Sequence, residues 1–257
     1  MRPSLGVVVP AFRPDPDHLV EYVRELVARL DIDTVRVELD APRSGVESRL
    51  RAADLPPSVT LSVARTRRGK GAAITAGFEA LDTDLLLFVD ADGSTPVDSV
   101  ERILEPLYGG RADVAVGSRR HPDSRILSHQ TFARRYLGDG FAWLASRLLE
   151  AELHDYQCGA KGLTAEWWER VRAHLYEPGF AWDIELVAMA AALGAHVVEV
   201  PIEWEDKPGS TVSPIGDTLS LARALFVVRH RAKRLGSSRL HDAIAERRDE
   251  TAIVDRK

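Results

Sequence analysis

Cysteine is almost absent from this sequence, because Cys158 is the only one among its 257 residues. A single cysteine excludes an intramolecular disulfide and a zinc site built from cysteines. This usage fits a reducing compartment. With 45% hydrophobic and 28% charged residues, a chain of this length can bury a substantial core without disulfides or structural metals.

Long hydrophobic runs are missing as well. The longest are Leu85–Val89 and the alanine-rich stretch Leu186–Leu193, whereas a membrane-spanning helix needs roughly 18–20 apolar residues. Residues 1–12 place Pro10 directly after a short apolar run and do not resemble a signal peptide. We expect a cytoplasmic protein, or one that is peripheral on the cytoplasmic face of a membrane.

Positive charge is not in excess either. The 34 lysines and arginines stand against 39 acidic residues, which gives a net charge of −5. This balance argues against a nucleic acid partner.

The first 117 residues alternate short apolar runs with amphipathic segments. This rhythm predicts an α/β fold, with a mostly parallel sheet flanked by helices. Strands are expected at Leu5–Val9, Thr34–Leu39, Val59–Val63, Leu85–Val89, Val114–Gly117 and Val197–Val200. Helices are expected from Asp15 to Leu30 and over 71–80, 97–107, 131–149, 164–175, 183–193 and 217–235. We predict one domain over 1–216, a helical extension over 217–236 and a polar, mobile tail over 237–257.

Two carboxylates, Asp90 and Asp92, directly follow the run Leu85–Val89. Ligands of open parallel sheets bind at the carboxyl ends of the strands. Residues i and i+2 of an extended segment point the same way, so the pair can hold a hard divalent cation together with substrate phosphates. The alternative is a polar turn that caps the next helix. An EF-hand is disfavoured, because Thr95 occupies the position that needs glycine.

Basic and acidic residues also follow the second and third strands. Gly69, Lys70 and Gly71 stand where a helix is expected to begin, which suits a phosphate; the alternative is a solvated basic loop. The spacing is not that of a P-loop. Asp40 stands alone after the second strand, where it can accept an N–H of a nucleotide base or a ribose hydroxyl.

These pieces, in this order, resemble the family 2 glycosyltransferases of GT-A fold. The nearest resemblance is to the polyprenyl-phosphate branch, notably dolichyl-phosphate glucosyltransferases, and it covers roughly residues 5–235. The matching segments are residues 7–12 (VVVPAF), Asp40, residues 68–73 (RGKGAA), residues 90–93 (DADG), residues 116–119 (VGSR), residues 155–161 (DYQCGAK), residues 182–185 (WDIE) and residues 204–211 (WEDKPGST).

The resemblance implies roles for individual residues. It implies a nucleotide-sugar donor, a UDP- or GDP-hexose, bound by Pro10, Ala11, Phe12, Asp40, Lys70, Asp90, Ala91, Asp92 and Lys207. A Mg²⁺ or Mn²⁺ ion would be held by the Asp90–Ala91–Asp92 (DxD) motif, with Asp92 the more direct ligand. Arg119 and Arg135, with Arg134 as the alternative to Arg135, would bind an acceptor phosphate.

Two further carboxylates stand at motif positions. Asp183 would orient the sugar or the acceptor, and Asp155 would contact sugar hydroxyls. The structural alternatives are an N-cap for Asp183 and a turn for Asp155. Arg13 and Pro14 replace the family's usual Asn-Glu. The family's two Asp followed by Gly-Ser correspond here to Leu39-Asp40-Ala41-Pro42, which keeps one Asp. These departures bear on base and sugar specificity more than on the reaction.

The expected last helix is basic and amphipathic. Its apolar stripe comprises Leu221, Leu225, Val228, Ala232 and Leu235, and the basic residues around it are Arg223, Arg229, Arg231, Lys233, Arg234 and Arg239. Such a helix can lie on an anionic membrane surface. Docking of the stripe on the domain is the alternative, and both can hold together.

The predicted function is a metal-dependent, inverting transfer of a hexose, with glucose favoured, to a polyprenyl (dolichyl) phosphate at the membrane. The alternatives are a family 2 enzyme with a soluble or glycan hydroxyl acceptor, a sugar-1-phosphate nucleotidyltransferase, and a degenerate transferase acting as a membrane scaffold. A processive synthase is disfavoured, because the sequence contains neither a Gln-x-x-Arg-Trp motif nor membrane spans.

Overall fold

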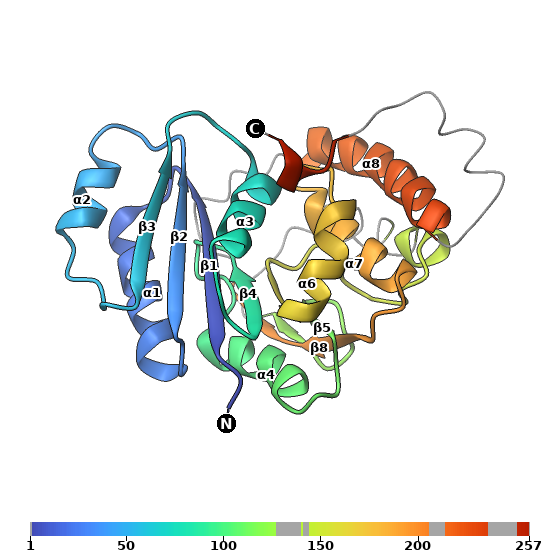
Figure 1. Cartoon of the computed structure of the whole chain (residues 1–257), viewed down its shortest axis with the longest axis horizontal. Helices are drawn as coiled ribbons and strands as arrows, with labels where there is room; N and C mark the ends of the chain where they lie inside the picture. The colour runs from blue at the N-terminus through green and yellow to red at the C-terminus, as the bar shows by residue number, and fades with distance from the viewer. Residues whose placement is uncertain (1, 127–139, 141–143, 206–213, 236–250, 257) are drawn as a thin grey trace.

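The computed structural model describes residues 2–126, 140, 144–205, 214–235 and 251–256. A seven-stranded sheet lies at its centre (Figure 1), in the order β3-β2-β1-β4-β7-β5-β8. The strands are β1 (Leu5–Phe12), β2 (Thr34–Asp40), β3 (Val59–Ala64), β4 (Leu85–Val89), β5 (Val114–Ser118), β7 (Ala160–Thr164) and β8 (Val197–Pro201). A two-stranded sheet joins β6 (Arg125–Ile126) to β9 (Glu203–Trp204).

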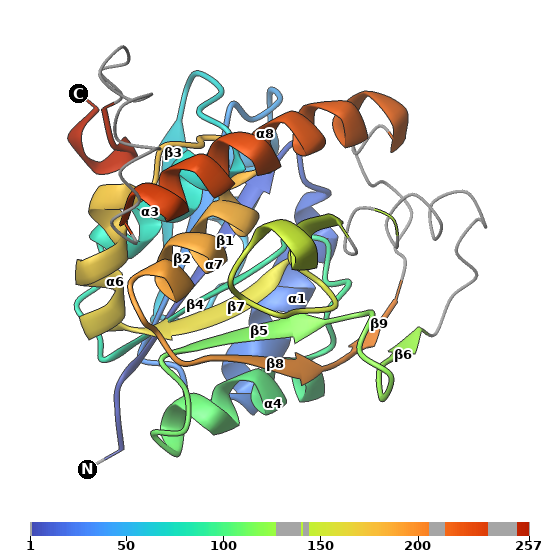
Figure 2. The ribbon, with the colours of Figure 1, turned by 90° about the vertical axis from the view of Figure 1, so that its right-hand side faces the viewer.

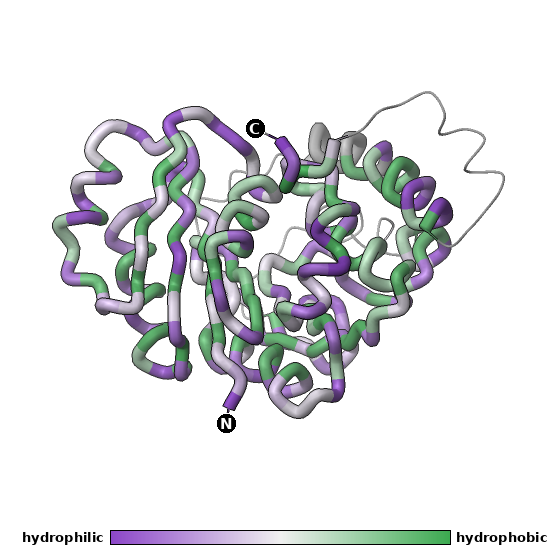
Figure 3. Tube along the Cα trace, in the orientation of Figure 1, coloured by the Kyte–Doolittle hydropathy of each residue, from purple (hydrophilic) through white to green (hydrophobic). Residues whose placement is uncertain are grey.

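Helices cover both faces of the sheet. One face carries α1 (Pro16–Arg29), α2 (Val46–Ala52) and α4 (Val97–Tyr108). The other carries α3 (Lys70–Glu79), α6 (Ala165–Val171), α7 (Trp182–Ala192) and α8 (Pro214–Leu235). Figure 2 shows α8 lying across α7, and Figure 3 shows apolar positions running along the central strands. Each face therefore has its own apolar core.

Local sequence explains several of these boundaries. The Asp15 side chain accepts hydrogen bonds from the backbone N–H groups of Asp17 and His18, and Pro16 opens α1. An Asp N-cap followed by a first-turn proline is a strong helix start. The predicted strand Leu85–Val89 matches β4, and β1, β2, β3, β5 and β8 extend one to three residues beyond their predicted ends.

The strand β7 was not predicted, because the segment AKGLT carries a lysine and no alternating pattern. It runs antiparallel to both β4 and β5, whereas all other pairs in this sheet are parallel. The short helix α2 was also missed. The helix predicted over 164–175 ends at Val171 and continues as a 3-10 turn, η1 (Arg172–His174).

The C-terminal segments pack on the domain where they are described. Leu225, Val228 and Ala232 of α8 join the core on the α7 side. Near the end of the chain, Ile253 is buried and donates its backbone N–H to the carbonyl of Leu175 at 2.8 Å. Residues 251–256 therefore contact the domain, and the mobility of the tail over 237–257 stays a prediction.

Candidate active site

The candidate site lies at the carboxyl ends of β1, β2 and β4. Pro10, Ala11 and Phe12 close β1, and Phe12 is paired in register with Asp40 at the end of β2. Asp90 follows β4 and donates its backbone N–H to the carbonyl of Gly159 at 2.8 Å. The antiparallel strand β7 thus brings the segment before it against the end of β4, so residues far apart in sequence meet at one edge of the sheet.

Asp90 forms an ion pair with Lys70. The Lys70 Nζ lies 2.9 Å from Asp90 Oδ1, and 39% of the Asp90 side chain is exposed. Gly159 leaves room for this carboxylate, since a Cβ there would collide with Asp90 Oδ2. Partial burial of the Asp90 carboxylate raises its pKa, although the positive charge of Lys70 opposes the shift.

Asp92 is exposed and lies in the turn after Asp90. Its Oδ1 accepts the backbone N–H of Ser94 at 2.9 Å, and its carbonyl oxygen lies 2.8 Å from His18 Nε2. The neighbouring Gly93 has φ of 65°, a conformation that glycine adopts at no steric cost. The turn therefore presents a carboxylate to solvent beside Asp90.

The donor set at Asp90 and Asp92 fits a hard divalent cation. Both are carboxylates, and a cationic ammonium already lies within ion-pair distance of Asp90. Within the described part of the chain, no group of three or more His, Cys, Asp or Glu residues could hold a metal ion. The remaining ligands would have to be oxygens of water or of a substrate diphosphate, which is how Mg²⁺ commonly binds.

Asp183 lies at the start of α7, with 3% of its side chain exposed, between two lysines. Lys70 Nζ lies 3.0 Å from its Oδ2, and Lys161 Nζ lies 3.1 Å from its Oδ1. Burial alone would raise the pKa of Asp183, but Lys161 and Lys70 outweigh it and lower that pKa. Burial alone would lower the pKa of Lys70, and Asp183 and Asp90 instead raise it. Asp183 and Lys70 are therefore both held in their charged forms.

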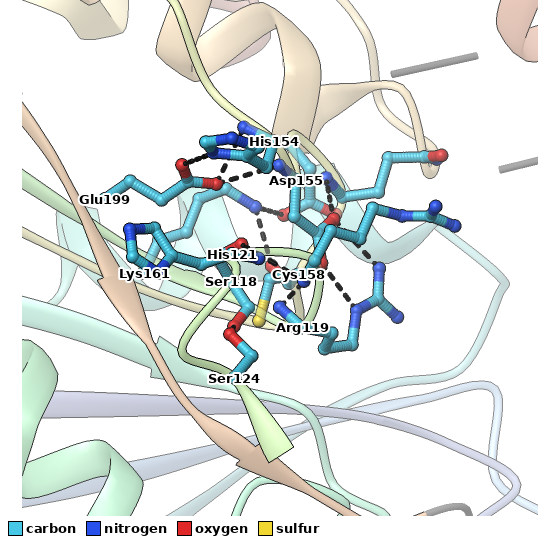
Figure 4. Close-up of polar contacts among 12 residues, drawn as sticks. Ser118, Arg119, His121, Ser124, His154, Asp155, Cys158, Lys161 and Glu199 are labelled. Carbon is cyan, nitrogen blue, oxygen red and sulfur yellow. Dashed lines mark hydrogen bonds and ion pairs between the residues drawn. The ribbon is translucent and has the colours of Figure 1, made fainter. Parts of the chain in front are cut away.

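Asp155 belongs to a second polar cluster, shown in Figure 4. Arg119 reaches it with a bidentate contact, Nε to Oδ2 at 2.7 Å and Nη2 to Oδ1 at 3.0 Å. The backbone N–H groups of Arg119 and Gln157 also donate to this carboxylate. Glu199 accepts the backbone N–H groups of His154 and Asp155. The loop after β5 is thereby fastened to the segment before β7.

This pairing makes stability depend on pH. Burial alone would raise the pKa of Asp155, but Arg119 outweighs it and lowers the value to about 2, against an ordinary 3.8. The resulting stabilisation, about 2 kcal/mol, is present above pH 3.8 and is lost as the pH falls through about 2. We expect the unfolding free energy to fall between pH 4 and pH 2, and urea unfolding at pH 4, 3 and 2.5 measures it.

The Asp155→Asn variant separates this contribution from those of other carboxylates. It leaves the Arg119 guanidinium without its counter-charge, so we expect a loss of about 3 kcal/mol at pH 7. Between pH 4 and 2.5 the variant should lose less stability than the parent. Parallel pH curves for parent and variant would contradict the pairing.

Comparison with known proteins places the chain in a family. The family model of glycosyl transferase family 2 matches residues 7–156. The chain belongs to that family. It is 31% identical over 170 residues to a dolichyl-phosphate beta-glucosyltransferase of Mus musculus, covering 64% of this chain and 52% of the relative. It is 32% identical over 163 residues to glycosyltransferase AglD of Haloferax volcanii, covering 62% of this chain and 25% of the relative.

The chain spans about half the length of the dolichyl-phosphate relatives it matches. Among solved structures, glucosyl-3-phosphoglycerate synthase of Mycobacterium tuberculosis, in complex with Mn²⁺, UDP-glucose and phosphoglyceric acid, gives a TM-score of 0.68 at 15% identity, covering 88% of this chain and 80% of that one. Mannosyl-3-phosphoglycerate synthase of Rubrobacter xylanophilus gives 0.67 at 15% identity, covering 96% and 77%. The predicted family and GT-A fold are confirmed.

Some side chains expected to bind the donor are already engaged in contacts within the protein. Asp40 accepts the backbone N–H groups of Arg68 and Gly69 and contacts Arg68 Nε. Its carboxylate therefore fixes the loop that leads into α3 and Lys70, and a contact between Asp40 and a nucleotide base stays a prediction. Ala91 lies half-buried between Asp90 and Asp92 in the sequence, and its contact with a donor stays a prediction. Lys207, Arg134 and Arg135 lie outside the described residues.

Two residues of this site were not among the sequence-based candidates. Lys161 and Gly159 were quoted only as part of a motif, yet one holds Asp183 and the other makes room for Asp90. Before the structure, the sequence offered only a lysine in the short segment AKGLT, and its complete burial follows from the strand β7, which the sequence did not predict. Cys158 is buried, and burial raises the pKa of its thiol to about 12, so it contributes packing.

Proposed function

We propose that this chain transfers a hexose, with glucose favoured, from a nucleotide sugar to a polyprenyl phosphate such as dolichyl phosphate, with inversion at the anomeric carbon. Family membership and the names of the dolichyl-phosphate relatives support this function. The donor would be a UDP- or GDP-hexose. The Mycobacterium tuberculosis neighbour, crystallised with Mn²⁺ and UDP-glucose, supports a UDP sugar and a divalent cation.

The state of Asp183 favours a phosphate acceptor over a hydroxyl acceptor. A hydroxyl must lose a proton as it attacks, and a carboxylate serves as base best when its pKa lies near the working pH. Asp183 instead has a lowered pKa and one lysine on each oxygen. Asp155 is similarly occupied by Arg119. A phosphate monoester, with a second pKa of about 6, is already ionised near pH 7 and needs no base.

The residues would divide the work as follows. Asp90 and Asp92 would hold Mg²⁺ or Mn²⁺, which would offset the charge that develops on the departing nucleoside diphosphate. Pro10, Ala11, Phe12 and Ala91 would line the donor site, and Lys70 and Lys207 would face the diphosphate. Arg119, together with Arg135 or Arg134, would bind the acceptor phosphate. Asp183 would hold Lys70 in place, and Asp155 would hold Arg119 in place.

Incubation with labelled nucleotide sugars tests the function directly. The protein would be mixed with dolichyl phosphate, Mg²⁺ or Mn²⁺ and a panel of UDP- and GDP-hexoses, and label entering the organic phase would be counted. We expect transfer from one of the nucleotide sugars and none after chelation with EDTA. Label that enters only soluble products would favour the hydroxyl-acceptor alternative.

A lipid-linked acceptor requires contact with a membrane surface. No helix in the described ranges is long and apolar enough to cross a bilayer. The outward side of α8 carries Arg223 and Arg234, both exposed, and Phe226, which is 56% exposed. A basic face with an exposed aromatic residue suits an anionic interface. We propose that this side of α8 docks the enzyme peripherally on the cytoplasmic face of the membrane.

Two basic residues of α8 have inward roles. Arg231 Nη1 contacts Glu185 Oε1 at 2.5 Å and Glu177 Oε1 at 3.1 Å. Lys233 contacts Glu150 at 2.8 Å. Burial raises the pKa of Glu185 to about 7, although Arg231 opposes the shift. These contacts fasten α8 to the domain, so Arg231 and Lys233 are poor choices for testing membrane binding.

The triple variant Arg223→Gln, Phe226→Ser, Arg234→Gln should bind anionic vesicles at least roughly tenfold more weakly. Each arginine near an anionic surface contributes about 1 kcal/mol, and the phenylalanine adds a similar amount by burial. Sedimentation with phosphatidylserine–phosphatidylcholine vesicles measures this. The control, Arg111→Gln with Arg170→Gln, removes two exposed charges elsewhere. Equal losses in both variants would show that net charge, and not α8, governs binding.

A further inference from the structure

Lys70 occupies an unusual position for a lysine at the start of a helix. Only 12% of its side chain is exposed. Its Nζ lies 2.9 Å from Asp90 Oδ1 and 3.0 Å from Asp183 Oδ2, and 5.2 Å from the centre of the Phe88 ring. A single positive charge therefore contacts two carboxylates, one of which belongs to the proposed metal site.

We propose that Lys70 and the divalent cation compete for Asp90, so that metal binding releases the Lys70 ammonium from that carboxylate. The inference rests on the proposed function only in taking Asp90 as a metal ligand. A doubly charged ion bound by Asp90 and Asp92 repels an ammonium held at the same carboxylate. Lys70 keeps its contact with Asp183, and its freed N–H groups become available to the donor diphosphate.

Lys161 keeps the Asp183 carboxylate neutralised and in position while Lys70 exchanges its partner. Its side chain has no exposed surface, and its Nζ contacts Asp183 Oδ1 at 3.1 Å and the Cys158 carbonyl at 2.6 Å. Lys70 uses the other oxygen of Asp183, Oδ2. Since the two lysines bind different oxygens, Asp183 remains neutralised and in place when Lys70 moves. Lys161 is thus a positioning residue, whereas Lys70 is the exchangeable one.

The charges explain why metal and donor should bind together. Asp90, Lys70, Asp183 and Lys161 form a chain of alternating charge with no net charge. When a divalent cation binds without a donor, its two positive charges lie close to the Lys70 ammonium and repel it. A bound nucleoside diphosphate supplies negative charge that attracts both the divalent cation and the Lys70 ammonium, which reduces this repulsion. The structure therefore assigns Lys70 a role in coupling metal affinity to donor occupancy.

Mn²⁺ binding, followed by the electron paramagnetic resonance signal of free Mn²⁺, tests the exchange with and without UDP. Lys70→Met removes the competing cation, so we expect about tenfold tighter Mn²⁺ binding than in the parent without UDP. UDP should then improve Mn²⁺ affinity less in this variant than in the parent. Lys70→Arg keeps a cation and should stay near the parent. Arg67→Gln removes an exposed charge from the same loop and should also stay near it.

Mn²⁺ affinity that is unchanged or weaker in Lys70→Met would overturn the exchange while leaving the metal site intact. A parent that binds no Mn²⁺ even with UDP would overturn the metal site and the exchange with it. If Arg67→Gln increased Mn²⁺ affinity as much as Lys70→Met does, the increase would come from the loss of any nearby positive charge. That result would overturn the specific competition between Lys70 and the metal.

A second measurement needs no substitution and covers the case in which Lys70→Met does not fold. The chain contains five lysines, Lys70, Lys161, Lys207, Lys233 and Lys257, so side-chain ammonium resonances of ¹⁵N-lysine-labelled protein can be assigned individually. Addition of Mg²⁺ with UDP should shift the Lys70 resonance strongly and the Lys161 resonance weakly. Equal shifts, or a shift of Lys161 alone, would overturn the assignment of Lys70 as the exchangeable partner.

Discussion

Replacing Asp92 by alanine should lower the rate of sugar transfer at least about 100-fold while leaving the protein folded. The variant loses a carboxylate of the proposed metal site, and removing one group that stabilises developing charge costs about 10²–10³ in rate. Asp92 is exposed, and its Oδ1 accepts a hydrogen bond from the Ser94 backbone N–H. The structural cost should therefore be only about 1 kcal/mol.

Initial transfer rates over a range of Mg²⁺ and Mn²⁺ concentrations check this expectation, with circular dichroism reporting the fold. Asp82→Ala provides the matched control, because Asp82 is also an exposed aspartate outside helices and strands but lies before β4 and not after it. Near-parental turnover of Asp92→Ala at saturating Mg²⁺ would contradict a role for this carboxylate in metal binding.

Replacing Gly159 by alanine should reduce metal-dependent transfer by roughly 10- to 100-fold, although the substitution changes no charged residue. The added Cβ would collide with the Asp90 carboxylate, so Asp90 would have to leave its present position. A displacement of about 1 Å at a reacting site can cost about 10²-fold. The effect should appear as weaker Mn²⁺ binding together with slower transfer.

Gly179→Ala is the matched control for this substitution. A Cβ at Gly179 meets no atom within 4 Å, so we expect near-parental Mn²⁺ affinity and rate. If Gly159→Ala bound Mn²⁺ as tightly as Gly179→Ala, the position of the Asp90 carboxylate would not matter for the metal. Thermal unfolding of both variants would show whether the difference is confined to the site.

The order of strands and helices in the first half of the chain was predictable because local signals agreed there. Apolar runs ended by polar residues predicted β1, β2, β3 and β4, and Asp15-Pro16 predicted the start of α1. The strand-end rule then placed Asp90 and Asp92 at the carboxyl edge of the sheet. The family motifs added residues of the second half, such as Asp183, which no local pattern would have brought to this site.

The contacts within the site were not predictable, because they depend on partners that only the fold brings together. Asp155 was expected to contact sugar hydroxyls, which stays a prediction, and the contact of its oxygens with Arg119 was not foreseen. Asp40 similarly holds the Arg68–Gly69 backbone. Lys161 lies in β7, whose register is set by pairing with β4 on one side and with β5 on the other. The spacing of residues along the sequence does not predict such pairing between distant strands.

The antiparallel strand β7 has a consequence for how the chain can be divided. It fills the space between β4 and β5 and pairs with both, yet the family model's match ends at residue 156, before β7 begins. A fragment cut at that point would retain Asp90 and Asp92 but would leave the facing edges of β4 and β5 with unpaired N–H and C=O groups. Open, apolar strand edges of this kind recruit other chains and promote aggregation. The smallest piece of this protein that closes its own sheet between these strands therefore extends through Thr164, and one that also supplies Asp183 extends through the start of α7.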